Sequence, residues 1–186
     1  SGRGGCQGGV HMLTKSSALS VVAEKVGARL HHAGLVLATA ESCTGGGIAS
    51  IITSVPGSSV WFDRGFVTYS NVSKEELLGV PVGLILSKGA VSREVVLAMA
   101  KGALDGSRAD IAVAVSGVAG PGGGTPEKPV GTVWMALMER GASGMAFCRH
   151  FAGCRESVRN QAILAVLNGL MEHLSSRPEA KIPSAY

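Results

Sequence analysis

The sequence predicts an α/β protein, folded as one domain in which helices and strands alternate. Segments with helical periodicity are interleaved with apolar runs, and segment 109–115 is an almost unbroken apolar run, typical of a strand buried on both faces. Glycine is abundant, at 27 residues, whereas aromatic residues make up only 4%. This composition fits an α/β protein with several tight turns better than a β-sandwich. A chain of 186 residues is long enough to bury its own core as one domain.

The first part of the chain predicts a helix, a strand, a tight turn and a second helix. Apolar residues recur at helical spacing over 17–32, and Gly34 ends that helix. The apolar run 35–38 then stops at hydroxyls and glycines, which indicates a strand followed by a tight turn. Helical spacing resumes at Ile48, and segment 60–69 has the composition of extended structure.

The rest of the chain continues this alternation. Ser92 is expected to cap the start of one helix with its hydroxyl. Segment 81–88 is ambiguous, and a short helix is one interpretation of it. We expect helices over 72–78, 93–104 and 155–174, and strands over 109–115, 130–137 and 145–151.

Charge and composition narrow the classes of partner. The formal net charge of +4 suits an anionic small molecule, whereas no basic stripe with interleaved aromatic residues points to nucleic acid. No apolar run approaches the roughly 18 residues of a membrane span, so we expect no membrane partner. The sequence has no H-E-x-x-H, E-x-x-H or paired-aspartate motif, and we therefore expect neither a metal nor another cofactor.

The cysteines indicate a reducing compartment. Cys6, Cys43, Cys148 and Cys154 have no C-x-x-C spacing and follow no signal peptide. We interpret them as reduced thiols of a cytoplasmic protein, and not as a disulfide framework or a zinc site.

The turn after the first strand is a candidate site. Ser42 lies in it, and the backbone N–H groups of Thr44, Gly45 and Gly46 are expected to face outward at the start of the next helix. Such groups bind anions and stabilise oxyanions, because they have no partner within the helix and carry the positive end of its dipole. The same residue types are also ordinary helix caps and turn formers, so both interpretations stay open.

Tyr69 and Lys74 form a second candidate site. Tyr69 comes at a strand end and Lys74 in or near the first turn of a short helix, so both side chains are expected at one edge of the sheet. A helix N-terminus and burial both disfavour a charged ammonium, and they shift the pKa of a lysine in the direction that a base requires. Alternatively, Lys74 is a solvated residue that pairs with Glu75 or Glu76.

The glycine-rich segment 116–126 joins two expected strands. It is not a dinucleotide-binding fingerprint, because a strand follows it, and no Gly-Lys-Ser/Thr ends it as in a Walker loop. Its backbone N–H groups can approach a ligand closely, although an ordinary surface loop fits equally well. Arg155 and Arg159, four residues apart near the start of the last helix, either clamp a phosphate or carboxylate or are surface charges.

Ser42 and Lys74 can together support nucleophilic catalysis. A serine hydroxyl is a weak nucleophile until a base removes its proton, and a neutral lysine amine can do this. The pKa of the lysine must then fall from about 10.4 to about 7 or 8, through desolvation and neighbouring positive charge. Tyr69 can orient the amine or relay its proton, and the N–H groups after Ser42 can bind the oxyanion. Cys43 is an alternative nucleophile that the residues alone do not exclude.

Several motifs resemble one family, in the same order along the chain. They are A-E-S-C-T-G-G at 40–46, P-G-S-S at 56–59, G-F-V-T-Y-S-N at 65–71, G-A-V-S at 89–92 and G-V-A-G-P-G-G at 117–123. Over about residues 17–175 the chain thereby resembles the C-terminal domain family of the competence-damage-inducible protein CinA. The resemblance implies a three-layer α/β/α sandwich with a central, largely buried mixed sheet, generally in a homo-oligomer.

Stand-alone members of this family resemble amidohydrolases that convert nicotinamide mononucleotide and water to nicotinate mononucleotide and ammonia. The resemblance implies that Ser42 is the nucleophile, Lys74 its base and Tyr69 an assisting residue. The expected substrate and oxyanion site adds Glu41, Thr44, Gly45, Gly46, Ser116, Gly117, Gly120, Gly122 and Arg159. Two other functions stay open, namely a non-catalytic nucleotide-binding module and an amidase that acts on a different carboxamide.

The domain with this resemblance is expected to occupy residues 13–175. The glycine-rich residues 1–12 are expected to be a disordered tail or an expression remnant. Residues 176–186 are polar, contain two prolines and are expected to be a frayed tail.

Overall fold

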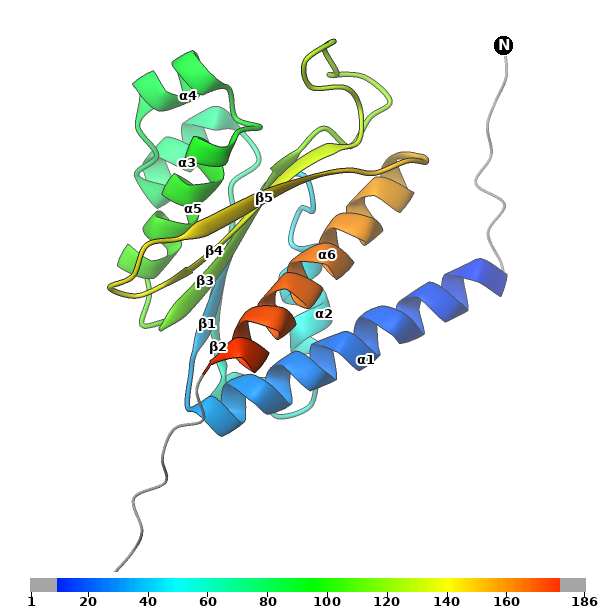
Figure 1. Ribbon diagram of the computed structural model, residues 1–186, viewed down its shortest axis with the longest axis vertical. Coiled ribbons are helices and arrows are strands. Elements are labelled where there is room, and N and C mark those ends of the chain that lie inside the picture. The colour runs from blue at the N-terminus through cyan, green and yellow to red at the C-terminus, as the bar shows by residue number, and fades with distance from the viewer. Residues whose placement is uncertain (1–9, 178–186) are drawn as a thin grey trace, which may run out of the picture.

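A five-stranded mixed sheet forms the centre of the fold (Figure 1). The computed structural model describes residues 10–177. The strand order is β2-β1-β3-β4-β5; β1 is parallel to β2 and β3, and β4 is antiparallel to β3 and β5. The predicted α/β class with a central mixed sheet is therefore confirmed.

Helices and strands alternate up to β2, three helices then precede β3, and two antiparallel strands and a last helix complete the chain. The strands are β1 (Leu37–Glu41), β2 (Phe62–Val67), β3 (Ile111–Gly117), β4 (Thr132–Glu139) and β5 (Met145–His150). The helices are α1 (Val10–Ala33), α2 (Gly47–Thr53), α3 (Asn71–Leu78), α4 (Val82–Lys88), α5 (Arg93–Asp105) and α6 (Arg155–Ser176), with a short 3-10 helix, η1 (Ser58–Val60), before β2.

The ends of the chain differ in part from the expected tails. Helix α1 begins at Val10, so residues 10–12 are helical, and α6 continues to Ser176. The rest of the expected tails, 1–9 and 178–186, lies outside the described residues. The ambiguous segment at 81–88 contains helix α4.

Strand β1 extends three residues further than its apolar run. The apolar run stops at residue 38, but pairing with β2 and β3 continues to Glu41, and Ser42 follows in the turn as expected. Thr39 and Glu41 are polar but fully buried. Glu41 remains in the strand because its carboxylate finds hydrogen-bond donors on α2, which removes the cost of burying it.

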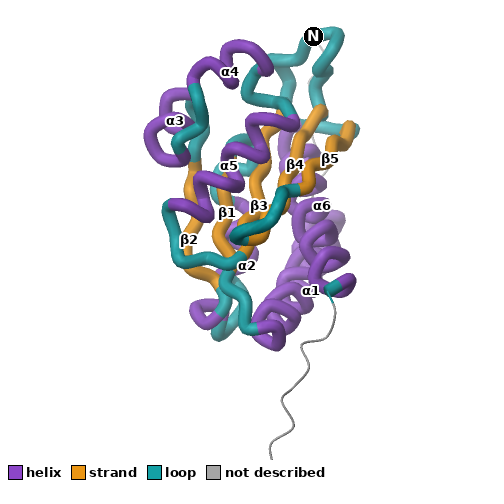
Figure 2. The backbone as a smooth tube through the Cα atoms, turned by 60° about the vertical axis from the view of Figure 1, so that its left-hand side comes forward, coloured by secondary structure: helices purple, strands orange, loops and turns teal. Residues whose placement is uncertain are grey.

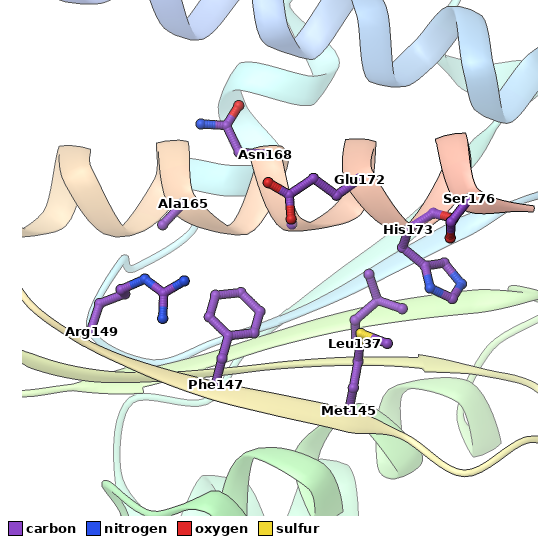
Figure 3. A pocket seen from close by; sticks show the side chains of 10 residues that line it. Leu137, Met145, Phe147, Arg149, Ala165, Asn168, Glu172, His173 and Ser176 are labelled. Carbon is purple, nitrogen blue, oxygen red and sulfur yellow. The ribbon is translucent and has the colours of Figure 1, made fainter.

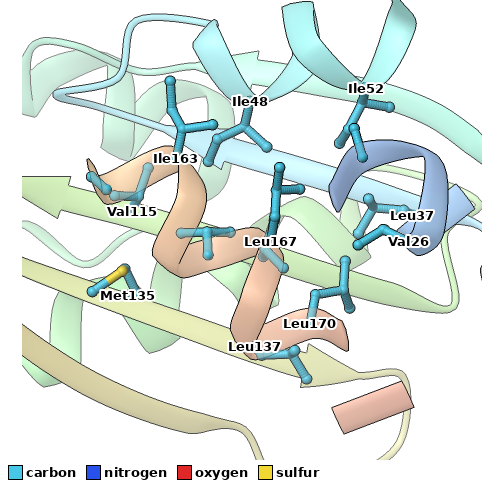
Figure 4. Close-up of a cluster of buried hydrophobic side chains, with 14 of the residues drawn as sticks. Val26, Leu37, Ile48, Ile52, Val115, Met135, Leu137, Ile163, Leu167 and Leu170 are labelled. Carbon is cyan, nitrogen blue, oxygen red and sulfur yellow. The ribbon is translucent and has the colours of Figure 1, made fainter. Parts of the chain in front are cut away.

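The two faces of the sheet carry side chains of different size. Toward α1, α2 and α6 the strands direct large apolar side chains such as Leu37, Val115 and Met135 (Figure 4). Toward α3, α4 and α5 the same strands direct Ala38, Ala40, Ala112, Ala114 and Ala136. Figure 2 shows α3, α4 and α5 together on this second face. The alternation of large and small residues allows α5 to pack close to the sheet.

Gly102 sets the distance between α5 and α3. A Cβ atom at residue 102 would lie 2.0 Å from the carbonyl oxygen of Leu78, the last residue of α3. Only glycine fits this close approach of the two backbones. The contact holds α3, which carries Lys74, against the rest of the domain.

The parallel strands bring three distant segments of the chain to one edge of the sheet. Ser42 follows β1, Tyr69 lies just beyond β2, and Gly117 ends β3. In an open α/β sheet, ligands bind beyond the carboxyl ends of the parallel strands. The sheet topology therefore places the candidate residues where a ligand site is expected.

Candidate active site

Ser42 occupies a tight turn between β1 and α2. Its N–H donates to the carbonyl of Val115 on the neighbouring strand β3, at 3.0 Å, which anchors the turn to the sheet. Gly45 and Gly46 follow with φ angles of 58° and 95°, a left-handed conformation that favours glycine. The turn leaves the Ser42 side chain 8% exposed.

The structure places the Lys74 amine against the Ser42 hydroxyl. Lys74 Nζ lies 3.0 Å from Ser42 Oγ, 2.8 Å from the carbonyl oxygen of Thr68 and 3.2 Å from that of Tyr69. The residue is only 1% exposed, although α3 is a surface helix. The alternative of a solvated lysine paired with Glu75 or Glu76 is therefore wrong.

Burial lowers the pKa of Lys74 below its ordinary value of 10.5, because the charged ammonium loses its hydration. The nearby Cys43 thiol opposes this shift. No acidic side chain within residues 10–177 forms an ion pair with the amine. The lowered pKa favours the neutral amine that a general base needs.

Glu41 caps α2 from the preceding strand. One carboxylate oxygen accepts from Thr44 Oγ1 at 2.6 Å and from the Ile48 N–H at 2.9 Å, and the other accepts from the Ala49 N–H at 3.0 Å. The start of α2 is thus already occupied by an anion of the protein itself. Neither Glu41 nor Thr44 lines the cavity described below.

The other turn residues bond within the turn or beneath it. The Gly45 N–H donates to the carbonyl of Ser42 at 3.0 Å, so one of the three amides expected to face a substrate is engaged. Arg159 donates from Nε to the carbonyl of Cys43 and from Nη2 to that of Thr44, both at 3.1 Å. Arg159, like Gly45 and Gly46, lies outside the cavity and supports the turn.

A cavity of about 300 Å³ opens beside the Ser42 and Lys74 side chains. Of the residues expected at the site it is lined by Ser42, Tyr69, Lys74, Ser116, Gly117, Gly120 and Gly122. It is also lined by Asn71, which was not expected there, and by Arg155, one of the two arginines considered as a clamp for a phosphate or carboxylate. Asn71 belongs to the motif at 65–71, and Arg155 lies one helical turn before Arg159. These two sequence patterns could therefore have identified both residues as part of the site.

Tyr69 contacts the site with two different atoms. Its carbonyl oxygen accepts from Lys74 Nζ, and its hydroxyl accepts from Arg155 Nη2 at 2.8 Å. The residue is 61% exposed, so its ring faces the open side of the cavity. Tyr69 thus contacts the Lys74 amine through its main chain, while its hydroxyl contacts Arg155.

Cys43 is a poor alternative nucleophile. It is buried, and burial raises the pKa of its thiol to about 11. The thiol is therefore protonated near neutral pH, whereas nucleophilic cysteines react as thiolates. Cys43 and Cys148 are free, but Cys154 is disulfide-bonded, so the expectation that all four thiols are reduced is wrong for that residue.

A larger cavity, of about 650 Å³, lies between β5 and α6 (Figure 3). His173 and Ser176 line it, yet they do not form a catalytic pair: His173 Nε2 contacts Glu139 Oε1, and the Ser176 hydroxyl donates to the carbonyl of His173. The cavity contains neither Ser42 nor Lys74. We therefore place the candidate active site in the smaller cavity.

Neither a metal cluster nor a membrane span is found in the part of the chain that the structure describes. Among residues 10–177, no three His, Cys, Asp or Glu side chains are grouped closely enough to hold a metal ion. No helix there combines the length and the apolar character needed to cross a membrane.

Comparison with known proteins identifies the family of the chain. The model of the CinA C-terminal domain matches residues 19–174. The chain is 53% identical to the nicotinamide-nucleotide amidohydrolase PncC of Pseudomonas putida, over 83% of this chain and 96% of that one. It is 49% identical to PncC of Escherichia coli strain K12, over 84% and 94% of the two chains.

Solved structures show the same fold. The competence/damage inducible protein CihA of Agrobacterium tumefaciens superposes with a TM-score of 0.82 at 42% identity, over 86% of this chain and 96% of that one. The competence damage-inducible protein A of Klebsiella pneumoniae superposes with a TM-score of 0.83 at 37% identity, over 86% and 99%. The chain belongs to the CinA C-terminal domain family.

Proposed function

We propose that this protein hydrolyses the carboxamide of nicotinamide mononucleotide, giving nicotinate mononucleotide and ammonia. Two relatives about half identical to it over most of their length are named nicotinamide-nucleotide amidohydrolases. The single observation that carries the chemistry is the 3.0 Å contact between Lys74 Nζ and Ser42 Oγ in a shared cavity. Such a reaction belongs to salvage of pyridine nucleotides in the cytoplasm.

The surroundings of Lys74 suit a neutral amine. A neutral amine has two N–H bonds and one lone pair, and the carbonyls of Thr68 and Tyr69 can accept both N–H bonds. The lone pair is then left for the hydroxyl proton of Ser42. The lowered pKa of Lys74 supports this protonation state.

The reaction follows a Ser-Lys acyl-enzyme route. Lys74 takes the Ser42 proton as Oγ attacks the carboxamide carbon, and it then gives that proton to the departing nitrogen, so that ammonia leaves. A water molecule attacks the acyl-enzyme with Lys74 again as base, releasing the carboxylate and restoring the Ser42 hydroxyl.

The oxyanion needs a donor close to Ser42. Within the turn 42–46, the cavity is lined by Ser42 and Cys43, and the Ser42 N–H is already bound to Val115. We therefore assign the oxyanion contact to the N–H of Cys43, the residue after the nucleophile, in place of the amides of Thr44, Gly45 and Gly46. A donor of this kind contributes about 10²- to 10³-fold to the rate.

Ammonia release from nicotinamide mononucleotide tests the proposal. Ser42→Ala and Lys74→Arg should each lower kcat by about 10³-fold or more, because the alanine has no hydroxyl to attack with and the arginine stays protonated and cannot accept a proton. The matched controls are Cys43→Ser, which should retain turnover, and Lys101→Met, which removes an exposed lysine of α5. Unchanged turnover in Lys74→Arg would contradict the dyad, and saturable binding without ammonia would indicate a nucleotide-binding module.

A further inference from the structure

We infer that Arg155 binds the phosphate of the substrate and makes the site prefer a nucleotide to the corresponding nucleoside. The inference rests on the proposed function and assigns a specificity-determining residue to the same cavity. Arg155 lines that cavity together with Ser42 and Lys74.

The guanidinium of Arg155 has N–H groups that make no hydrogen bond with the described residues. Nη1 donates to the carbonyl of Gly120 in the glycine-rich loop, and Nη2 donates to the hydroxyl of Tyr69, both at 2.8 Å. An arginine side chain carries five N–H bonds, and these two contacts use two of them. The other three have no hydrogen-bond partner within residues 10–177.

Charge favours an anion next to Arg155. No aspartate or glutamate lines this cavity, and Arg155 forms no ion pair with an acid in the described part of the chain. Lys74, the other basic residue of the lining, is held by two carbonyls and the Ser42 hydroxyl. Arg155 is thus the positive charge available to a ligand, and a guanidinium binds phosphate through two parallel hydrogen bonds.

The position of Arg155 matches a substrate with reactive and anionic groups at opposite ends. Tyr69 contacts Lys74 with its carbonyl and Arg155 with its hydroxyl, so one residue spans from the base to the guanidinium. Nicotinamide mononucleotide likewise carries its carboxamide on the ring and its phosphate on the far side of the ribose. The geometry therefore orients the carboxamide toward Ser42 when Arg155 holds the phosphate.

Arg159 does not fit this role, although both it and Arg155 were considered as a phosphate clamp and Arg159 was the one expected at the substrate site. Its contacts with the carbonyls of Cys43 and Thr44 direct it to the turn, and it does not line the cavity. The two arginines lie four residues apart on α6: Arg159 supports the chain turn at 42–46, whereas Arg155 faces the cavity.

The test compares two substrates that differ only in the phosphate. For Arg155→Met, kcat/KM for nicotinamide mononucleotide should fall about 10- to 100-fold, the value of charge-assisted hydrogen bonds. For nicotinamide riboside, kcat/KM should change by less than about threefold, since that substrate has no phosphate to lose. Arg149→Met, which removes an arginine of β5 outside this cavity, is the matched control and should change neither value.

Tyr69→Phe tests whether the hydrogen bond between Arg155 and the Tyr69 hydroxyl contributes to the preference for the nucleotide. This variant lacks the Tyr69 hydroxyl but still has the Arg155 guanidinium. The ratio of kcat/KM for the nucleotide to kcat/KM for the riboside should therefore stay near the wild-type ratio. An equal fall for both substrates in Arg155→Met would show that Arg155 positions Tyr69 or the glycine-rich loop, and would overturn the inference. No fall for either substrate would overturn it as well.

Calorimetry separates this inference from the proposed function. The single variant Ser42→Ala should bind nicotinamide mononucleotide about 10- to 100-fold more tightly than the double variant that also carries Arg155→Met. The two variants should bind nicotinamide riboside with the same affinity. If the wild-type protein releases no ammonia but this difference appears, the phosphate site stands and the proposed hydrolysis fails. Equal affinities in the two variants would reject the phosphate site whatever the activity.

Discussion

Burial lowers the pKa of Lys74 and so favours its neutral form. Its amine is enclosed by Ser42 and by the carbonyls of Thr68 and Tyr69, and the lost hydration lowers its pKa. The same burial that prepares a base also destabilises the folded protein at any pH where the lysine is charged. At the scale of one residue, stability and proton transfer are thus linked through a single pKa.

This linkage predicts how stability depends on pH. Between the lowered pKa of Lys74 in the folded protein and 10.5, the unfolded chain holds a proton that the folded chain has released. The free energy of unfolding contributed by this site therefore rises with pH across that window and is lowest below it. Lys74→Met should remove this rise, as measured by urea unfolding at several pH values.

Lys101→Met is the control for the pH series. Lys101 is an exposed lysine that pairs with Asp105, and its removal should leave the rise in place. Parallel stability curves for the wild type and Lys74→Met would contradict a lowered pKa at residue 74. The kcat/KM of the wild type should also rise with pH through a pKa below 10.5, since the neutral amine is the active form.

At the scale of elements, the site depends on how closely α3 approaches α5. Ser42 and Lys74 are separated by 32 positions in the chain, and their side chains meet only when α3 is seated. Gly102 permits this, because any side chain there would meet the backbone of Leu78. The alanine face of β1 and β3 contributes by letting α5 lie close to the sheet.

Gly102→Ala should therefore impair both stability and catalysis. Its Cβ would lie 2.0 Å from the Leu78 carbonyl, so α3 must shift, and overpacking of this kind costs about 1–3 kcal/mol. A displacement of Lys74 by about 1 Å should lower kcat by about 10²-fold. Thermal unfolding and ammonia release measure the two effects.

Gly83→Ala provides the matched control. Gly83 is also helical, in α4, but a Cβ atom there would meet nothing within 4 Å. The free energy of unfolding should stay the same or rise slightly, because alanine has the higher helix propensity. If Gly102→Ala behaved like Gly83→Ala, the close approach of α3 and α5 would not limit the site.

At the scale of the whole molecule, one core lies on each face of the sheet. The larger apolar side chains gather beneath α1, α2 and α6, and the alanine-rich face lies beneath α3, α4 and α5. The candidate pair takes one residue from each side, since Ser42 follows the central strand β1 while Lys74 comes from α3. The core beneath α6 should therefore contribute to stability without supplying the Lys74 side of the site.

Leu167→Ala tests this separation. Leu167 is fully buried in the core beneath α6 (Figure 4), and its truncation should lower the free energy of unfolding by about 2–5 kcal/mol. Well below the unfolding transition, kcat should stay near the wild-type value, because Leu167 does not line the cavity that holds Ser42 and Lys74. The exposed Leu77→Ala should change stability little. A large loss of kcat in folded Leu167→Ala would show that the two faces are coupled.

Local pattern was sufficient for much of the fold. Helical and apolar periodicity predicted most elements, since each periodicity depends on neighbouring residues and on burial of one face. It did not show that Glu41 is buried at the end of β1 and accepts hydrogen bonds from α2. It also left segment 81–88 open, because that helix has only seven residues.

By itself the sequence determined the α/β class, the family and the candidate pair Ser42 and Lys74, through periodicity and motifs that are local in the chain. Only the tertiary structure decided which arginine faces the cavity, that Tyr69 holds the amine with its carbonyl, and that Glu41 caps α2. The choice of arginine depends on contacts of α6 with segments far from it in the chain. The other two facts depend on the path of the turns after β1 and β2, which packing of the helices on the sheet sets and which apolar periodicity does not encode.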